Sequence, residues 1–129
     1  MNELFIKTVP IPKGRPRFYG GHAVTPEKTR KYEKLIRDSW EHGIVNSEHI
    51  YVDMLFKMPI PQSYSKKKQA ALVDAPHAKK PDLDNLVKAV LDALNGVAFE
   101  DDSRICSISA VKLYGTEPCV FVKMEGEEE

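Results

Sequence analysis

One stretch, residues 81–96, constrains the fold of this chain most, because its apolar side chains recur at the spacing of a helix with one buried side. Pro81 ends the segment before it, and Asp82 or Asp84 can cap the helix that follows. An Asn-Gly pair at 95–96 supplies a left-handed stop. The sequence therefore predicts an amphipathic helix from Asp84 to Leu94, with a buried stripe of Leu83, Leu86, Val87, Val90, Leu91 and Leu94.

Charged side chains occupy the other side of this helix. Asp84, Lys88 and Asp92 follow one another at i, i+4 and therefore stand in one column, where Asp92 can pair with Lys88. Asp82 lies just ahead of the helix, and the chain reaches Asp101-Asp102 within a few residues of its end. Several carboxylates and one ammonium group can therefore lie close together at one point in space.

Such a cluster suits divalent-metal chemistry on phosphate. Mg²⁺ prefers hard oxygen ligands and takes one or two carboxylates before water and substrate phosphates complete its shell. A bound metal lowers the pKa of its water, and a lysine one turn away adds a fixed positive charge for the transition state. The spacing alone also fits a simpler picture, in which one aspartate caps the helix, the column is a ladder of surface ion pairs, and the later acids form a polar turn.

The full string from Pro81 to Asp102, PDLDNLVKAVLDALNGVAFEDD, closely resembles the signature of the RusA family, endonucleases that resolve Holliday junctions. Two upstream pieces are similar to those of phage- and prophage-type members: PKGRPR at 12–17, and PIP at 59–61 followed by SKKK at 65–68. Between them these matches touch most of the chain, and the central match is highly specific.

The resemblance implies a homodimer that uses Mg²⁺, with Mn²⁺ as a substitute, to nick two opposed strands of a four-way DNA junction in recombination and repair. The family's metal-binding aspartates match Asp82, Asp84 and Asp102, and its catalytic lysine matches Lys88. Asp101 matches a neighbouring acid whose role is usually secondary, and it stays a candidate metal ligand. A four-way junction has approximate two-fold symmetry, so a dimer offers one active site for each nick.

A formal net charge of zero hides an uneven distribution along the chain. Residues 7–37 hold nine Lys/Arg and two Glu, a net charge of +7, and residues 57–80 hold six Lys and one Asp, a net charge of +5. Residues 82–102 hold one Lys and six acids, a net charge of −5. A phosphodiester nuclease needs cations for the DNA backbone and carboxylates for the metal. The first basic segment also fits a solvated loop; with the resemblance, the candidates for DNA contact are Lys13, Arg15, Arg17, Lys66, Lys67, Lys68, Lys79 and Lys80.

The remaining segments predict a single α+β domain over 1–124, a RusA-like mixed sheet of about four strands with packed helices, followed by a frayed acidic tail at 125–129. A hairpin that turns at Gly115 would join the last two strands and keep Cys106 and Cys119 apart, which favours two reduced thiols over a disulfide. The expected strands are 2–9, 49–58, 105–114 and 118–124.

Two further helices are predicted. Thr25 as N-cap and Pro26 at the first helical position open one that Gly43 stops. Ser63 or Ser65 can cap a short basic helix that ends at Leu72. The apolar stripe of the first is expected to hold Tyr32, Leu35, Ile36 and Trp40.

The sequence also limits the classes of function. No apolar run is long enough to cross a membrane, no secretory signal is present, and no Gly-rich phosphate loop indicates a nucleotide cofactor, so we expect a cytoplasmic protein. Two alternatives to a junction nuclease stay open. A non-catalytic protein would bind branched DNA and never cut it, whereas an enzyme for a small phosphoester would show little salt-dependent DNA binding.

Overall fold

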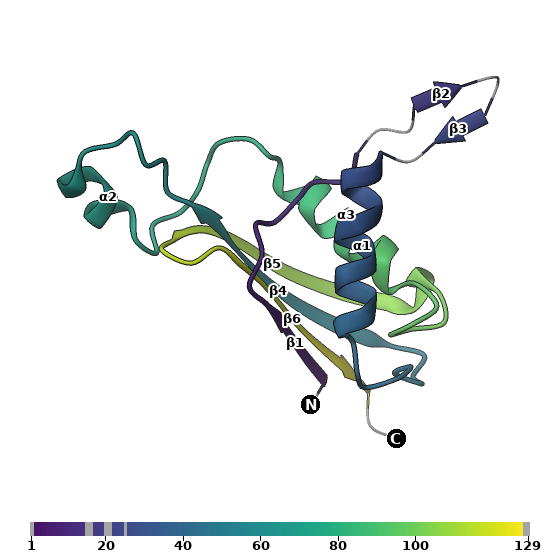
Figure 1. Cartoon of the computed structure of the whole chain (residues 1–129). Helices are drawn as coiled ribbons and strands as arrows, with labels where there is room; N and C mark the ends of the chain where they lie inside the picture. Colours follow the sequence, from purple (N-terminus) through teal and green to yellow (C-terminus); the bar gives the residue numbers. More distant parts are fainter. Residues whose placement is uncertain (1, 15–16, 20–21, 25, 128–129) are drawn as a thin grey trace.

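A four-stranded mixed sheet forms the centre of the fold, with the strand order β1-β6-β4-β5. Figure 1 shows the computed structural model, in which α1 and α3 lie on the same side of this sheet. The structure describes residues 2–14, 17–19, 22–24 and 26–127, with side chains within 2–14 and 26–127. The arrangement confirms the predicted α+β domain.

The elements have the following bounds. The large sheet holds β1 (Asn2–Ile6), β4 (Ile50–Pro59), β5 (Ile105–Gly115) and β6 (Cys119–Gly126). A separate pair of short strands consists of β2 (Arg17–Tyr19) and β3 (His22–Val24). The helices are α1 (Glu27–Ser39), α2 (Lys66–Leu72) and α3 (Leu83–Leu94), with a 3₁₀ turn η1 (Asp102–Arg104) before β5.

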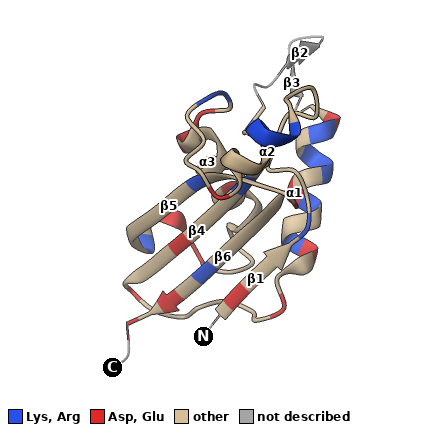
Figure 2. Cartoon of the chain, turned by 90° about the vertical axis from the view of Figure 1, so that its left-hand side faces the viewer, with Lys and Arg blue, Asp and Glu red and all other residues tan. Residues whose placement is uncertain are grey.

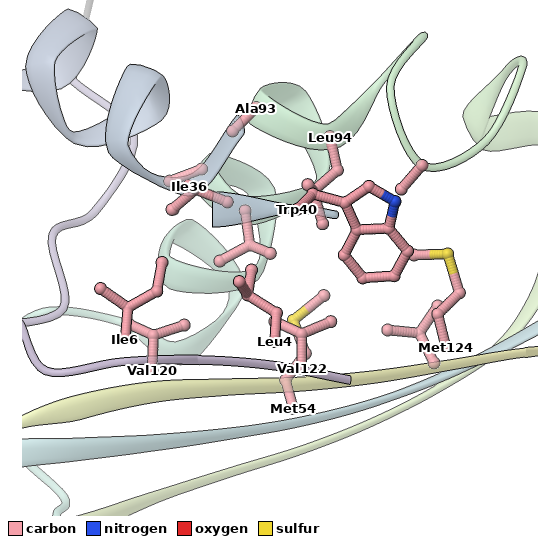
Figure 3. Packing of buried hydrophobic residues seen from close by; sticks show 14 of the residues in the cluster. Leu4, Ile6, Ile36, Trp40, Met54, Ala93, Leu94, Val120, Val122 and Met124 are labelled. Carbon is pink, nitrogen blue, oxygen red and sulfur yellow. The ribbon is translucent and has the colours of Figure 1, made fainter. Parts of the chain in front are cut away.

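The core fills the space between the sheet and the two long helices (Figure 3). Side chains of β4 alternate between buried and outward positions, as the period of two predicts, and Phe56 is fully buried at its centre. The predicted stripe of α3 is confirmed, because Leu86, Val90 and Leu94 are fully buried. α1 adds Tyr32 and Ile36, with Trp40 just beyond its end.

The predicted hairpin between the last two strands is wrong. β4 lies between them, parallel to β5 and antiparallel to β6, so that Tyr51 is in register with both Ser107 and Glu125. The turn residues near Gly115 do reverse the chain, but β4, whose inner face is buried from Ile50 to Met58, lies between the two strands. Both cysteines are free thiols, as predicted, in this different arrangement.

Several boundaries also differ from expectation. β1 ends at Ile6, and α1 begins at Glu27 with Pro26 in the N-cap position, while the predicted cap Thr25 lies outside the described residues. Leu35 is 41% exposed instead of buried. Of the two candidate caps for α2, Ser65 is the one whose hydroxyl accepts a hydrogen bond from the Lys68 N–H.

The C-terminal acidic residues extend the sheet. β6 continues to Gly126, and the Glu127 N–H donates to the His49 carbonyl at 3.1 Å. Residues 125–127 therefore belong to the folded domain instead of the predicted tail, and 128–129 lie outside the described residues. Among the helices of the described chain, none combines the length and apolar character that a membrane span requires.

Candidate active site

The chain approaches the acidic helix α3 along the outer edge of β5. The Asp74 N–H donates to the Tyr114 carbonyl at 2.9 Å, and the Tyr114 N–H donates back to Ala75 at 2.9 Å. The His77 N–H then donates to the Lys112 carbonyl at 3.0 Å. This short antiparallel pairing limits where the following residues, up to Asp82, can lie.

Lys112 holds the next part of this loop from the side. Its Nζ donates to the carbonyl oxygens of Lys79 and Pro81, each at 2.6 Å. Lys112 is in register with the buried Phe56 of β4, so its side chain leaves the sheet on the face that carries the core. The loop therefore reaches α3 with its backbone tied to the sheet.

Asp82 occupies the N-cap position of α3 but does not cap it through its side chain. Its Oδ1 accepts a hydrogen bond from the Lys80 Nζ at 2.9 Å. This hydrogen bond, with the charge of Lys80, holds the pKa of Asp82 below its ordinary value. Asp84 lies in the first turn of α3, and both carboxylates are exposed. The intervening Leu83 packs on the core, which fixes this turn to the domain.

Lys88 lies one turn further along α3 and is exposed. In the part of the chain that the structure describes, it has no ion-pair partner, so the expected pair with Asp92 is wrong. Asp92 Oδ2 lies 3.2 Å from the Nζ of Lys13, which also donates to Glu33 on α1 at 2.6 Å. The Lys13 N–H donates to the Asn85 carbonyl at 3.0 Å.

Lys13 is thus a structural contact. Partial burial lowers its pKa, but the hydrogen bonds and charges of Glu33 and Asp92 outweigh that effect, and the pKa of Lys13 is raised. Its ammonium stays charged and ties the N-terminal segment to α1 and α3. Such a residue has less freedom to contact DNA than the exposed lysines of the other basic segments.

For the activity that the RusA resemblance implies, cleavage of a four-way junction, Asp92→Ala is expected to slow the rate less than tenfold, because Asp92 holds Lys13 and the partly exposed pair contributes only about 0.2–1 kcal/mol. Single-turnover cleavage beside Asp84→Asn measures the difference. Equal losses in the two variants would show that Asp92 acts together with the aspartates of the first turn.

Asp101 and Asp102 lie at the opposite end of α3. They come just before Ile105, where β5 begins, whereas Asp82 follows the loop that Lys112 holds. Ile105 and Lys112 are seven positions apart along β5, a separation of roughly 23 Å. The twelve residues of α3 span a similar length, about 18 Å.

The acids therefore form two groups in one chain. Across the described residues, no three His, Cys, Asp or Glu side chains are placed to share a metal ion. The expected convergence on a single point does not occur within one chain. Asp101 accepts a hydrogen bond from the Ser103 N–H at 3.1 Å, which caps η1 and holds the pKa of Asp101 low. Within the same described residues, Asp102 has no such partner.

The pair Asp82 and Asp84 fits Mg²⁺ by the chemistry of its donors. Mg²⁺ in enzymes is usually held by one or two carboxylates, with water and phosphate completing the shell. Both carboxylates are exposed, and the low pKa of Asp82 keeps it ionised at neutral pH. Asp101 and Asp102 do not belong to this donor set within one chain.

Basic side chains surround the Asp82 end of α3. A hollow of about 690 Å³ is lined by His77, Ala78, Lys79, Lys80, Asp82, Leu83 and Lys112. Lys79 Nζ donates to the Tyr64 hydroxyl at 3.0 Å, and Lys68 Nζ lies 3.9 Å from the centre of the Tyr64 ring. Figure 2 shows Lys and Arg gathered on α1 and α2, while the strands of the sheet are mostly uncharged.

The predicted DNA contacts fall into three groups. Lys66, Lys67 and Lys68 are exposed on α2, and Lys79 and Lys80 are exposed in the loop before α3. Lys13 is held in the ion pairs described above. Arg15 and the side chain of Arg17 lie outside the described residues.

Lys112 and Tyr64 were not among the residues predicted from the sequence. Lys112 carried a signal, because it follows Ile108 and Ala110 at alternate positions of an expected strand, where an inward-facing lysine needs a buried acceptor. No pattern in the sequence pointed to Tyr64, since its partner Lys79 is fifteen residues away in a loop.

Comparison with known proteins identifies the family of this chain. The family described as Endodeoxyribonuclease RusA matches residues 7–125, a range that includes both groups of aspartates, Lys88 and Lys112. A protein of Bacillus subtilis (strain 168), named uncharacterized protein YqaN, is 32% identical over 124 residues, which cover 88% of this chain and 87% of that protein. The chain belongs to the RusA family of endodeoxyribonucleases.

Proposed function

We propose that this protein is a Mg²⁺-dependent endonuclease that resolves four-way DNA junctions by paired, symmetric nicks. The observation that carries the proposal is the pair Asp82 and Asp84, presented together in the first turn of α3 beside exposed lysines. Carboxylates for a hard cation, next to ammonium groups for a phosphate backbone, are the parts that phosphodiester hydrolysis requires. Family membership supports the same substrate class.

In this proposal each residue has a separate task. Asp82 and Asp84 would hold Mg²⁺, whose chemistry there would be to activate a water and to neutralise charge on the phosphoryl oxygens. Lys88, exposed one turn along the same helix, places a positive charge on the transition state. Lys80 pairs with Asp82, and a cation bound at that carboxylate would leave the Lys80 ammonium free for a phosphate. The products carry a 5′-phosphate and a 3′-hydroxyl.

The lysines of α2 and the loop before α3 bind the DNA backbone. Lys66, Lys67 and Lys68 are exposed, with Lys79 and Lys80 beside the acidic pair, so the positive charge lies next to the cleavage point. Binding through several phosphates weakens steeply with salt, because each neutralised phosphate releases counterions. The same contacts do not select a sequence, which suits a protein that recognises DNA branching.

We further propose a homodimer in which two β5 strands lie edge to edge. Among the described residues, only 74–77 pair with the outer edge of β5, and that pairing begins at Lys112. From Cys106 to Ser109 the side chains are exposed on both faces, and Ile108 and Val111 are each 45% exposed. A free strand edge with exposed apolar side chains favours pairing with another strand.

An antiparallel arrangement of the two edges also accounts for the separated acids. A two-fold axis near Ile108 would set Cys106 of one copy beside Val111 of the other, because antiparallel strands run in opposite directions. Asp102 of one copy then lies at the Asp82–Asp84 end of the other. In this proposal each active site takes Asp82, Asp84 and Lys88 from one copy and Asp102, with Asp101 beside it, from the second.

The test uses a labelled synthetic four-way junction and a linear duplex, each incubated with the protein in EDTA, in Mg²⁺ and in Mn²⁺. Symmetric nicks on the junction alone, dependent on the metal, are expected. Binding of the junction without cutting under every metal would instead favour a non-catalytic junction-binding protein, whose acids never close around a cation. No binding to either DNA would contradict the proposal altogether.

A further inference from the structure

We infer that Lys112 is a positioning residue: its ammonium clamps the loop at residues 79–81 to β5 and thereby sets the place of Asp82. Its effect on cleavage rests on the function proposed above, whereas the clamp itself does not. Lys112 lies in a strand far from the acidic motif in the sequence, and only the fold brings its Nζ to the two carbonyls before Asp82.

The hydrogen bonds of the loop show why one side chain matters here. Backbone pairing with β5 stops at the His77 N–H, and the helical bonds of α3 begin with the Leu86 N–H, which donates to the Asp82 carbonyl. Between these two points, over residues 78–81, no backbone–backbone hydrogen bond is formed within the described chain. The bonds from Lys112 to Lys79 and Pro81 supply the missing tie to the sheet.

The surroundings of Lys112 favour this role over a surface ion pair. Its side chain is half-buried on the core face of the sheet, and within the described residues it forms no salt bridge. A lysine in such a place needs hydrogen-bond acceptors, and a charged donor makes stronger bonds to carbonyls than a neutral donor does. Two of its three N–H groups bond to carbonyls two residues apart, so they hold the loop on both sides of Lys80.

Limited proteolysis tests the clamp without any reference to catalysis. Trypsin can cut after Lys79, and in the folded protein this bond should be protected by the tie to β5. In Lys112→Met, which keeps a long side chain but no donor, cutting after Lys79 is expected to be at least about tenfold faster. Lys112→Arg, which keeps donors, should be cut at an intermediate rate. The matched control Lys123→Met, a half-buried lysine of the sheet that pairs with Glu125, should be cut like the unaltered protein.

Cleavage kinetics test the consequence for Asp82. Lys112→Met is expected to lower kcat on a four-way junction by about 10–100-fold and to raise the Mg²⁺ concentration for half-maximal rate, with little change in KM for DNA. Lys112→Arg should recover part of both losses, which a general loss of stability would not do. Thermal unfolding of each variant shows whether the domain stays folded.

The outcomes separate the clamp from the proposed function. If trypsin cuts after Lys79 no faster in Lys112→Met than in the unaltered protein, the clamp is contradicted. If trypsin cuts faster but the variant's Mg²⁺ requirement for junction cleavage is unchanged, the role of Lys112 in placing Asp82 is contradicted. If Lys112→Met does not fold, the same two readouts on Lys112→Arg and Lys112→Gln decide the matter. If the unaltered protein cuts no junction while the Lys79 bond is exposed in Lys112→Met, the clamp stands and the nuclease proposal fails.

Discussion

Asp84→Asn is expected to abolish cleavage of a four-way junction while leaving its binding intact. Asparagine has nearly the shape of aspartate but lacks its charge, and Asp84 is exposed, so the fold of α3 is not disturbed. The substitution replaces a negatively charged oxygen ligand of the proposed metal site with a neutral amide oxygen, and we expect a rate loss of roughly 10³-fold or more. Binding should persist or tighten, because one negative charge next to the DNA phosphates is removed.

Asp53→Asn is the matched control for this variant. Asp53 is an exposed aspartate on β4, on the face of the sheet away from α3, and the substitution removes the same charge. Cleavage by single turnover and binding in EDTA are measured for both variants over a range of Mg²⁺. Equal activity of Asp84→Asn and Asp53→Asn would contradict the assignment of Asp84, and loss of binding in Asp84→Asn would point to a fold defect.

Mixing two inactive variants is expected to restore cutting. If Asp102 acts in the site of the second copy, a mixed dimer of Asp84→Asn with Asp102→Asn has both defects in one site and none in the other. Random exchange of subunits then leaves about a quarter of all sites intact, and each mixed dimer nicks one strand. If all ligands come from one chain, every site in the mixture carries one defect and nothing is cut.

This experiment separates the composite site from dimerisation as such. The two variants are refolded together, or mixed until subunits exchange, and each alone serves as the inactive reference. Dimer formation is followed by sedimentation, with Ile108→Arg as the variant expected to disrupt the β5 edges, because it places two charges at the proposed axis. A dimeric mixture without activity would contradict the composite site and leave Asp102 without a role in it.

The structure explains which expectations from sequence held. The helix α3, the strand β4 and the short helix α2 all follow from local patterns: apolar spacing, alternation, and a serine cap. These signals lie within a dozen residues of one another, so they do not depend on the rest of the fold. The hairpin failed for the opposite reason. Turn residues near Gly115 show that the chain reverses, but not that β4, which ends at Pro59, lies between the two strands.

In the candidate site, too, some of the proximities follow from local sequence and others depend on the tertiary fold. Asp82, Asp84 and Lys88 are close in sequence on one helix, and their proximity follows from the helical repeat. Asp102 is also close in sequence, yet the length of α3 carries it to the other end of β5. Asp92 stands one turn from Lys88, but tertiary packing brings Lys13 nearer, and the ion pair forms there.

Sequence alone indicated the chemistry that we propose, because the donors of a metal site and the cations for phosphate are properties of residue types within one short stretch. It also determined the acidic helix and its buried face, since both depend on a period of 3.6 residues. Three features appear only in the folded chain: the acids form two groups, Lys112 ties the loop before Asp82 to the sheet, and, among the described residues, the outer edge of β5 is paired only from Lys112 to Tyr114. These features depend on strand order, which joins residues far apart in the chain and leaves no local pattern in the sequence.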